Sequence, residues 1–159
     1  MTRIGIALFD GAEELDWAGP WEVLAAWAQQ WPDDGVEVFT LSQRDGEITC
    51  AKGLRVLPDR TWAEAGKLDV LVYPGGRGTR RELKDEAVLE WLRGMQGDGA
   101  LMTSVCTGAL VYAAAGFLRT AAGVSAGIDM ALHLVARLHS KERAREVRRY
   151  IQYDPEPPV

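Results

Sequence analysis

Short apolar runs alternate with amphipathic segments along most of this chain. Arg3–Phe9 is an apolar run that ends at Asp10 and Gly11, which is typical of a buried strand in a parallel sheet. Similar runs predict further strands at Val36–Leu41, Leu68–Tyr73 and Ala100–Val105, and a strand-like piece before Gly123. The runs Ile48–Cys50 and Leu54–Leu57 flank a Lys-Gly pair and predict a hairpin or two short strands.

Helical spacing fills the intervals between these runs. A helix carries Val23, Leu24 and Trp27, with Pro20 expected in its first turn, and a second carries Val88, Trp91, Leu92 and Met95. Thr107–Leu118 is small and apolar on every face, which predicts a buried helix. Ile128–Leu138 and a segment capped by Ser140 and running to about Gln152 predict two more helices, and Asp154–Val159 is expected to be extended. Strands that alternate with helices predict an α/β fold, a parallel sheet covered on both faces.

Composition narrows the class of protein. With 159 residues, 47% hydrophobic and 26% charged, the chain is long enough for one globular domain, residues 1–159. A net charge of −5 argues against nucleic acid or an anionic membrane as the main partner, and no apolar stretch has the length of a membrane span. Basic residues at 141–149 are interrupted by Glu142 and Glu146, which indicates a solvated helix face. Two separated cysteines, Cys50 and Cys106, do not form a disulfide scaffold, so we expect a reducing, cytoplasmic setting.

The strongest chemical signal is Thr103-Ser-Val-Cys-Thr-Gly108. A predicted strand ends at Cys106, a predicted helix starts at once, and Gly108 permits a tight turn, which is the layout of a nucleophile elbow with cysteine in place of serine. The turn would place Sγ at the carboxyl edge of the sheet, the helix N-terminus would favour the thiolate, and the Thr107 N–H would be free to bind a developing negative charge. The alternative is a small cysteine packed in an apolar core.

Two weaker signals accompany the elbow. In Tyr73-Pro-Gly-Gly76 a strand ends in a turn without side chains, where backbone N–H groups of Gly75 and Gly76 could approach a ligand, although the same tetrapeptide is also an ordinary turn. Asp16 lies between Leu15 and Trp17. If it is buried beside a thiol, its pKa rises and it can hold or donate a proton; the alternative is a solvated carboxylate at a helix start.

Other chemistry is not indicated. His133 and His139 are expected at the surface rather than in a Cys-His pair, and no His, Cys and Asp cluster has metal-ligand spacing. The sequence has neither a dinucleotide-binding Gly-x-Gly-x-x-Gly pattern nor a P-loop, so no cofactor is expected.

Together these residues resemble the DJ-1/PfpI (class I glutamine amidotransferase-like) superfamily over nearly the whole chain. The marks of the resemblance are Phe9-Asp-Gly11, Leu15-Asp-Trp-Ala-Gly-Pro20, Tyr73-Pro-Gly-Gly76, Ser104-Val-Cys-Thr-Gly108, Ala122-Gly-Val-Ser-Ala-Gly-Ile-Asp129 and Tyr153-Asp-Pro155. The resemblance implies a flavodoxin-like three-layer α/β/α sandwich and a homodimer, with tryptophans near the first helix, including Trp17, Trp21, Trp27 and Trp31, as weak further support.

The acid in Leu-Asp-x-x-Gly-Pro and the Ser-Val-Cys-Thr-Gly elbow resemble the isonitrile hydratase branch, which hydrates an isonitrile to an N-substituted formamide. The resemblance implies that Cys106 is the nucleophile, that Asp16 relays a proton and that Thr107 supports the thiolate or the water. It also implies that the N–H groups of Gly76 and Thr107 form an oxyanion pocket, with Gly75 and Gly108 shaping the site. Protease-like members carry His after the cysteine, so Thr107 disfavours peptidase activity.

Two alternatives remain, a non-enzymatic ligand or oxidation sensor and glyoxalase-like aldehyde chemistry. The same fold forms the sensing half of some transcription regulators, but the chain given ends at Val159 without a helix-turn-helix domain, which counts against that regulator. Family members usually have a strand, helix and strand where Arg119 here meets Thr120, so a segment of the pocket wall is expected to be absent from this sequence, either deleted or omitted.

Overall fold

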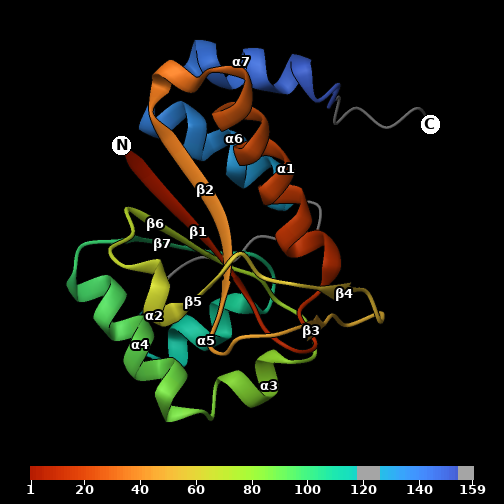
Figure 1. Ribbon diagram of the computed structural model, residues 1–159, viewed down its shortest axis with the longest axis vertical. Helices are drawn as coiled ribbons and strands as arrows, with labels where there is room; N and C mark the ends of the chain where they lie inside the picture. The colour runs from red at the N-terminus through yellow and green to blue at the C-terminus, as the bar shows by residue number, and fades with distance from the viewer. Residues whose placement is uncertain (118–125, 154–159) are drawn as a thin grey trace.

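The computed structural model describes residues 1–117 and 126–153, and Figure 1 shows a central sheet with helices on both faces. Five parallel strands form the sheet in the order β5-β2-β1-β6-β7. Their bounds are Thr2–Leu8 (β1), Val36–Ser42 (β2), Arg60–Thr61 (β5), Val70–Tyr73 (β6) and Leu101–Ser104 (β7). A separate antiparallel hairpin joins Ile48–Thr49 (β3) to Arg55–Val56 (β4). The structure confirms the α/β prediction of a flavodoxin-like sandwich.

The middle strands are apolar because helices cover both of their faces. Ile4 and Ile6 of β1 are fully buried, as are Val70 and Val72 of β6. These strands therefore read as continuous hydrophobic runs rather than as alternating ones.

The helices of the described residues form two groups on the two faces of the sheet (Figure 1). The first group is α1 (Glu14–Gln30), α6 (Ala126–Leu138) and α7 (Lys141–Tyr150), and the second is α2 (Trp62–Ala65), α3 (Thr79–Glu82), α4 (Glu86–Gly97) and α5 (Gly108–Ala114). One 3-10 turn, η1 (Pro32–Asp34), follows α1. The short elements η1, β5, α2 and α3 have too few residues to show a period, so the sequence pattern missed them.

Pro20 does not open a helix as expected. It lies inside α1, which begins at Glu14, and α6 packs against it: a methyl group added to Gly127 would lie 3.2 Å from the Pro20 ring. The first turn is held instead by the Glu13 N–H, which donates to the Gly75 carbonyl at 2.9 Å. Tertiary contacts thus hold the start of α1, although Pro20 donates no hydrogen bond inside the helix.

Two further expectations need correction. The elbow helix α5 is not buried on every face, since Leu110 is 54% exposed and Ala113 and Ala114 are exposed as well. The basic face of α7 is not wholly solvated, because Arg143 forms an ion pair with Asp34 at 2.6 Å. The strand-like piece before Gly123, the junction of Arg119 with Thr120 and the tail after Tyr153 lie outside the described residues.

Candidate active site

Cys106 stands in a strained turn between β7 and α5. Its φ angle is 52°, a left-handed conformation that non-glycine residues adopt at a cost. The Val105 N–H fixes the strand end by donating to the Tyr73 carbonyl at 3.0 Å. At Gly108 a side chain would collide with the carbonyl oxygens of Tyr73 and Pro74. This arrangement is the strand-turn-helix elbow that the sequence predicts, and it leaves Cys106 partly exposed.

The Pro-Gly-Gly turn after β6 lies directly beside the elbow. The Gly75 N–H donates to Asp16 Oδ2 at 2.9 Å, and the Gly76 N–H donates to Thr107 Oγ1 at 3.0 Å. A methyl group on Gly75 would lie 2.7 Å from each of three atoms, Asp16 Oδ2, Thr107 N and Thr107 Oγ1. Glycine is therefore required here because α1, this turn and the elbow converge on one point.

Asp16 is a buried carboxyl group in the first turn of α1. Its side chain is fully inaccessible, and burial raises its pKa, while the hydrogen bond from Gly75 lowers the pKa by less. Its Oδ1 atom is buried and has no hydrogen-bond partner in the described part of the chain. Within the described residues, the hydrogen bond that this carboxylate accepts comes from the Gly75 N–H. The proton relay from Asp16 to Cys106 stays a prediction.

Thr107 joins the elbow to the glycine turn. Besides accepting from Gly76, its hydroxyl lies 3.3 Å from Thr79 Oγ1, which donates to the Gly76 carbonyl at 2.7 Å. The Gly76 N–H is thus already satisfied, which differs from its expected role as an oxyanion donor. The Thr107 N–H has no partner among residues 1–117 and 126–153, so it is the donor available beside Cys106.

A cavity of about 280 Å³ opens over the cysteine. Its lining residues are Glu13, Gly76, Arg77, Thr79, Arg80, Leu83, Cys106, Thr107 and Leu110. Sequence reasoning missed Glu13, the two arginines and Thr79, although the polar run from Arg77 to Glu82 directly after the glycine turn was a visible signal. Asp16 lies behind the cavity wall rather than in it.

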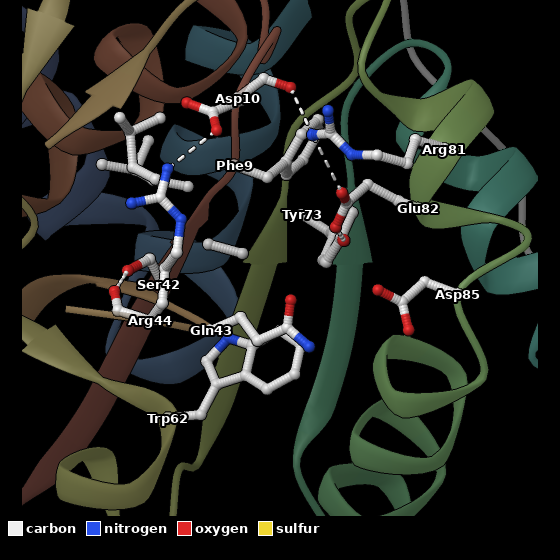
Figure 2. Close-up of a pocket in the computed structure, with 13 residues that line it drawn as sticks. Phe9, Asp10, Ser42, Gln43, Arg44, Trp62, Tyr73, Arg81, Glu82 and Asp85 are labelled. Carbon is white, nitrogen blue, oxygen red and sulfur yellow. Dashed lines mark hydrogen bonds and ion pairs between the residues drawn. The ribbon is translucent and has the colours of Figure 1, made fainter. Parts of the chain in front are cut away.

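A second cavity, of about 270 Å³, lies at the carboxyl ends of β1, β2 and β6 (Figure 2). The Tyr73 hydroxyl donates there to Glu82 Oε2 at 3.1 Å, and burial raises the pKa of both groups. Arg44 and Arg81 flank the opening, and each binds Asp10, Arg44 through the carboxylate and Arg81 through the backbone carbonyl. Both arginines and both buried groups are therefore engaged with protein partners.

The other cysteine and the two histidines do not line the Cys106 cavity. Cys50 is fully buried, and burial raises the pKa of its thiol, so Cys106 is the accessible cysteine. His133 and His139 are exposed, as predicted. In the part of the chain that the structure describes, no three His, Cys, Asp or Glu side chains could together hold a metal ion, and no helix is long and apolar enough to span a membrane.

A parallel α/β sandwich with a cysteine at a strained elbow defines the class of this protein. The model of the DJ-1/PfpI family matches residues 2–137, and the chain belongs to that family. It is 31% identical to an isonitrile hydratase from Pseudomonas putida, an alignment that covers 98% of this chain and 80% of that protein. It is 34% identical to the deglycase PfpI from Pyrococcus furiosus over 58% of this chain and 57% of that protein. Both relatives bear the names of enzymes.

Solved structures agree on the fold. A ThiJ/PfpI family protein from Pseudomonas syringae superposes with a TM-score of 0.88 at 23% identity, covering 99% of this chain and 77% of that one. The alignment with the hydratase runs over 189 positions, 30 more than this chain has residues, so that relative has internal segments without a counterpart here.

Proposed function

We propose that the chain is an isonitrile hydratase-like lyase that converts an isonitrile and water to an N-substituted formamide. The observation that carries the proposal is the elbow itself. A strained, accessible Cys106 faces a cavity, with the free Thr107 N–H beside it and a buried acid behind it. The 31% identity to an isonitrile hydratase over nearly the whole chain supports the same chemistry.

The proposed reaction has two steps. Cys106 Sγ adds to the terminal carbon of the isonitrile, and that carbon takes up a proton, which gives a thioimidate with a C=N bond. Water then adds to the thioimidate carbon, nitrogen takes a proton, and the C–S bond breaks. The products are the formamide and the restored thiol, so no oxidant or reductant is consumed.

The protein groups divide these tasks. The Thr107 N–H lies where it can stabilise negative charge on the oxygen of the tetrahedral adduct. The Thr107 hydroxyl, fixed by Gly76 and Thr79, orients the water. Asp16, beside the Gly75 turn, holds or releases a proton, because burial raises its pKa above the ordinary range of a carboxyl group. Gly75, Gly76 and Gly108 keep the backbone close enough for these contacts.

The test is turnover of an alkyl isonitrile, followed as formamide production. We expect activity in the wild type, none in Cys106→Ala, and retained activity in the matched control Cys50→Ala, since Cys50 is buried away from the cavity. Turnover that survives in Cys106→Ala would refute the proposal.

Aldehyde chemistry at the same thiol is the second candidate, favoured by the identity to a deglycase. Methylglyoxal offered to the same three proteins separates the two functions, since a glyoxalase-like enzyme would consume it faster than any isonitrile.

A further inference from the structure

Two arginines without acidic partners line the Cys106 cavity. Arg77 and Arg80 are both exposed, both face the cavity, and neither forms an ion pair or side-chain hydrogen bond with another described residue. They extend from the loop after β6 and from α3, directly following the glycine turn.

Most other arginines of this acidic chain are neutralised. Ion pairs join Arg3 and Arg60 to Glu37, Arg44 to Asp10, Arg81 to Glu82, Arg93 to Glu86, and Arg143 to Asp34. Arg77 and Arg80 differ from these arginines because their positive charge is not neutralised by a described acidic side chain, although the chain has a net charge of −5.

The charge of the cavity wall is positive. Among the described residues Glu13 is the one acid that lines it, and Lys52 Nζ compensates that carboxylate through an ion pair. A neighbouring groove of about 580 Å³ shares Arg77 and Arg80 with the cavity and adds Lys84. Its acid, Asp10, is paired with Arg44, and its third arginine, Arg81, is paired with Glu82. Such a surface attracts small anions toward the cysteine.

The cavity lining also includes apolar side chains. Leu83 and Leu110 line the cavity, and Leu110 is 54% exposed. A ligand that satisfies both the basic and the apolar lining residues has a short apolar body and an anionic group a few bonds from the atom that Cys106 attacks.

We propose that the substrate of Cys106 carries a carboxylate and that Arg77 and Arg80 bind it. A guanidinium group offers paired N–H donors that match a carboxylate, which makes arginine better suited to this task than lysine. Resting on the hydratase function proposed above, the substrate class is an α-isocyano carboxylate with a small apolar side chain, and the product is an N-formyl amino acid.

The first experiment needs no assumption about the reaction. Cys106 is alkylated with iodoacetate and with iodoacetamide, which differ in charge but not in reaction type, and the ratio of the two rates is compared with that of glutathione. We expect a ratio at least threefold above that of glutathione, falling with added salt because exposed charges are screened. Cys50 does not interfere because it is fully buried.

The matched variants locate the effect. Arg77→Gln/Arg80→Gln should lower the rate ratio toward that of glutathione, whereas Arg145→Gln/Arg149→Gln removes equal charge from the exposed face of α7 and should leave the ratio high. A wild-type ratio equal to that of glutathione, without salt dependence, overturns the inference even if the variants fail to fold.

The second experiment compares isocyanoacetate with its methyl ester. We expect a higher kcat/KM for the acid, and a loss of that preference in Arg77→Gln/Arg80→Gln. If neither isonitrile turns over but iodoacetate is favoured, the anion site stands and the hydratase function fails. If both turn over without preference and the alkylation ratio matches that of glutathione, the hydratase stands and the anion site fails.

Discussion

At the scale of residues, the site depends on groups that would be unfavourable elsewhere. Cys106 has a positive φ angle, and Asp16 is buried with one oxygen unpartnered within the described chain. Such features persist only where the surrounding structure compensates for them, and they concentrate at functional sites. For Asp16 the compensation includes the hydrogen bond from the Gly75 N–H.

We expect Asp16→Asn to lower kcat/KM about 100-fold or more, because an amide cannot exchange a proton while it can still accept the Gly75 hydrogen bond. Steady-state kinetics on an alkyl isonitrile measures the loss, and near-wild-type circular dichroism is the control for folding. Activity within a few-fold of wild type would contradict a proton-relay role.

The same variant has a stability signature. Because the pKa of Asp16 is raised in the folded state, the folded protein binds the proton more tightly than the unfolded one, so stability falls as pH rises from 3.8 through the folded pKa. Asp16→Asn removes this penalty. Its Tm should therefore exceed that of the wild type at neutral pH, and the difference should shrink as the pH is lowered toward 4, as measured by thermal unfolding.

Gly75→Ala tests the convergence of the three segments. Its methyl group would lie 2.7 Å from Asp16 Oδ2 and from two atoms of Thr107. We therefore expect the free energy of unfolding to fall by about 1–3 kcal/mol and most of the activity to be lost.

Gly94→Ala in α4 is the matched control. Nothing lies within 4 Å of its methyl group, so it should stabilise the helix by about 0.5–1 kcal/mol. Denaturant unfolding compares them, and equal effects would disprove the convergence.

At the scale of elements, a buried carboxylate fastens α7 to the first helix. Asp34 of η1 accepts from Arg143 Nε at 2.6 Å and from Trp27 Nε1 at 2.6 Å, and its side chain is 8% exposed. These hydrogen bonds, with Arg143 the main cause, lower the pKa of Asp34. The link steadies the helical layer that includes α1, which carries Asp16.

Asp34→Ala should destabilise the fold by about 1–3 kcal/mol, because it leaves the N–H of the buried Trp27 without its acceptor and removes one of the two carboxylate partners of Arg143. Glu142→Ala, which removes an exposed partner of Arg145, should cost less than about 0.5 kcal/mol. Since the pKa of Asp34 is lowered in the folded state, its contribution is lost as pH falls through that pKa. Urea unfolding at pH 7 and pH 3 measures the free energy of unfolding of each protein. We expect the difference between the wild type and Asp34→Ala to be smaller at pH 3, and a larger difference at pH 3 would contradict this account.

At the scale of the whole molecule, the first helix leaves apolar side chains exposed. Trp17 and Trp27 lie in the core, which removes part of the reason for expecting tryptophans at an interface, while Trp21 is 36% and Leu15 44% exposed. The prediction of a homodimer therefore rests mainly on the family resemblance.

We expect light scattering at micromolar concentration to give the mass of two 17.5 kDa chains. Burying apolar side chains such as Trp21 and Leu15 in a dimer would remove them from water. Trp21→Glu should weaken a dimer that uses this surface, with exposed Glu22→Gln as the control. A monomer at that concentration would refute the prediction.

Much of the fold follows from the sequence alone. Buried parallel strands must be continuously apolar and α4 must be amphipathic, so Arg3–Phe9 and the repeat of Val88 and Leu92 identify them without tertiary knowledge. Ser140 likewise caps α7 as predicted, accepting from the Arg143 N–H at 3.0 Å, because capping is a local interaction.

The site was only partly predictable. A cysteine between a strand and a helix specifies an elbow, because its geometry involves adjacent residues. Other features of the site join segments far apart in the chain. They are the hydrogen bond from Gly75 to Asp16, the hydrogen bond from Gly76 to Thr107, and the two arginines that line the cavity with Cys106. The packing of α1 against the ends of β6 and β7 decides those contacts. Hydrogen bonds and ion pairs act over a few ångströms between these segments, so the pattern of hydrophobic and polar positions within one segment does not reveal them.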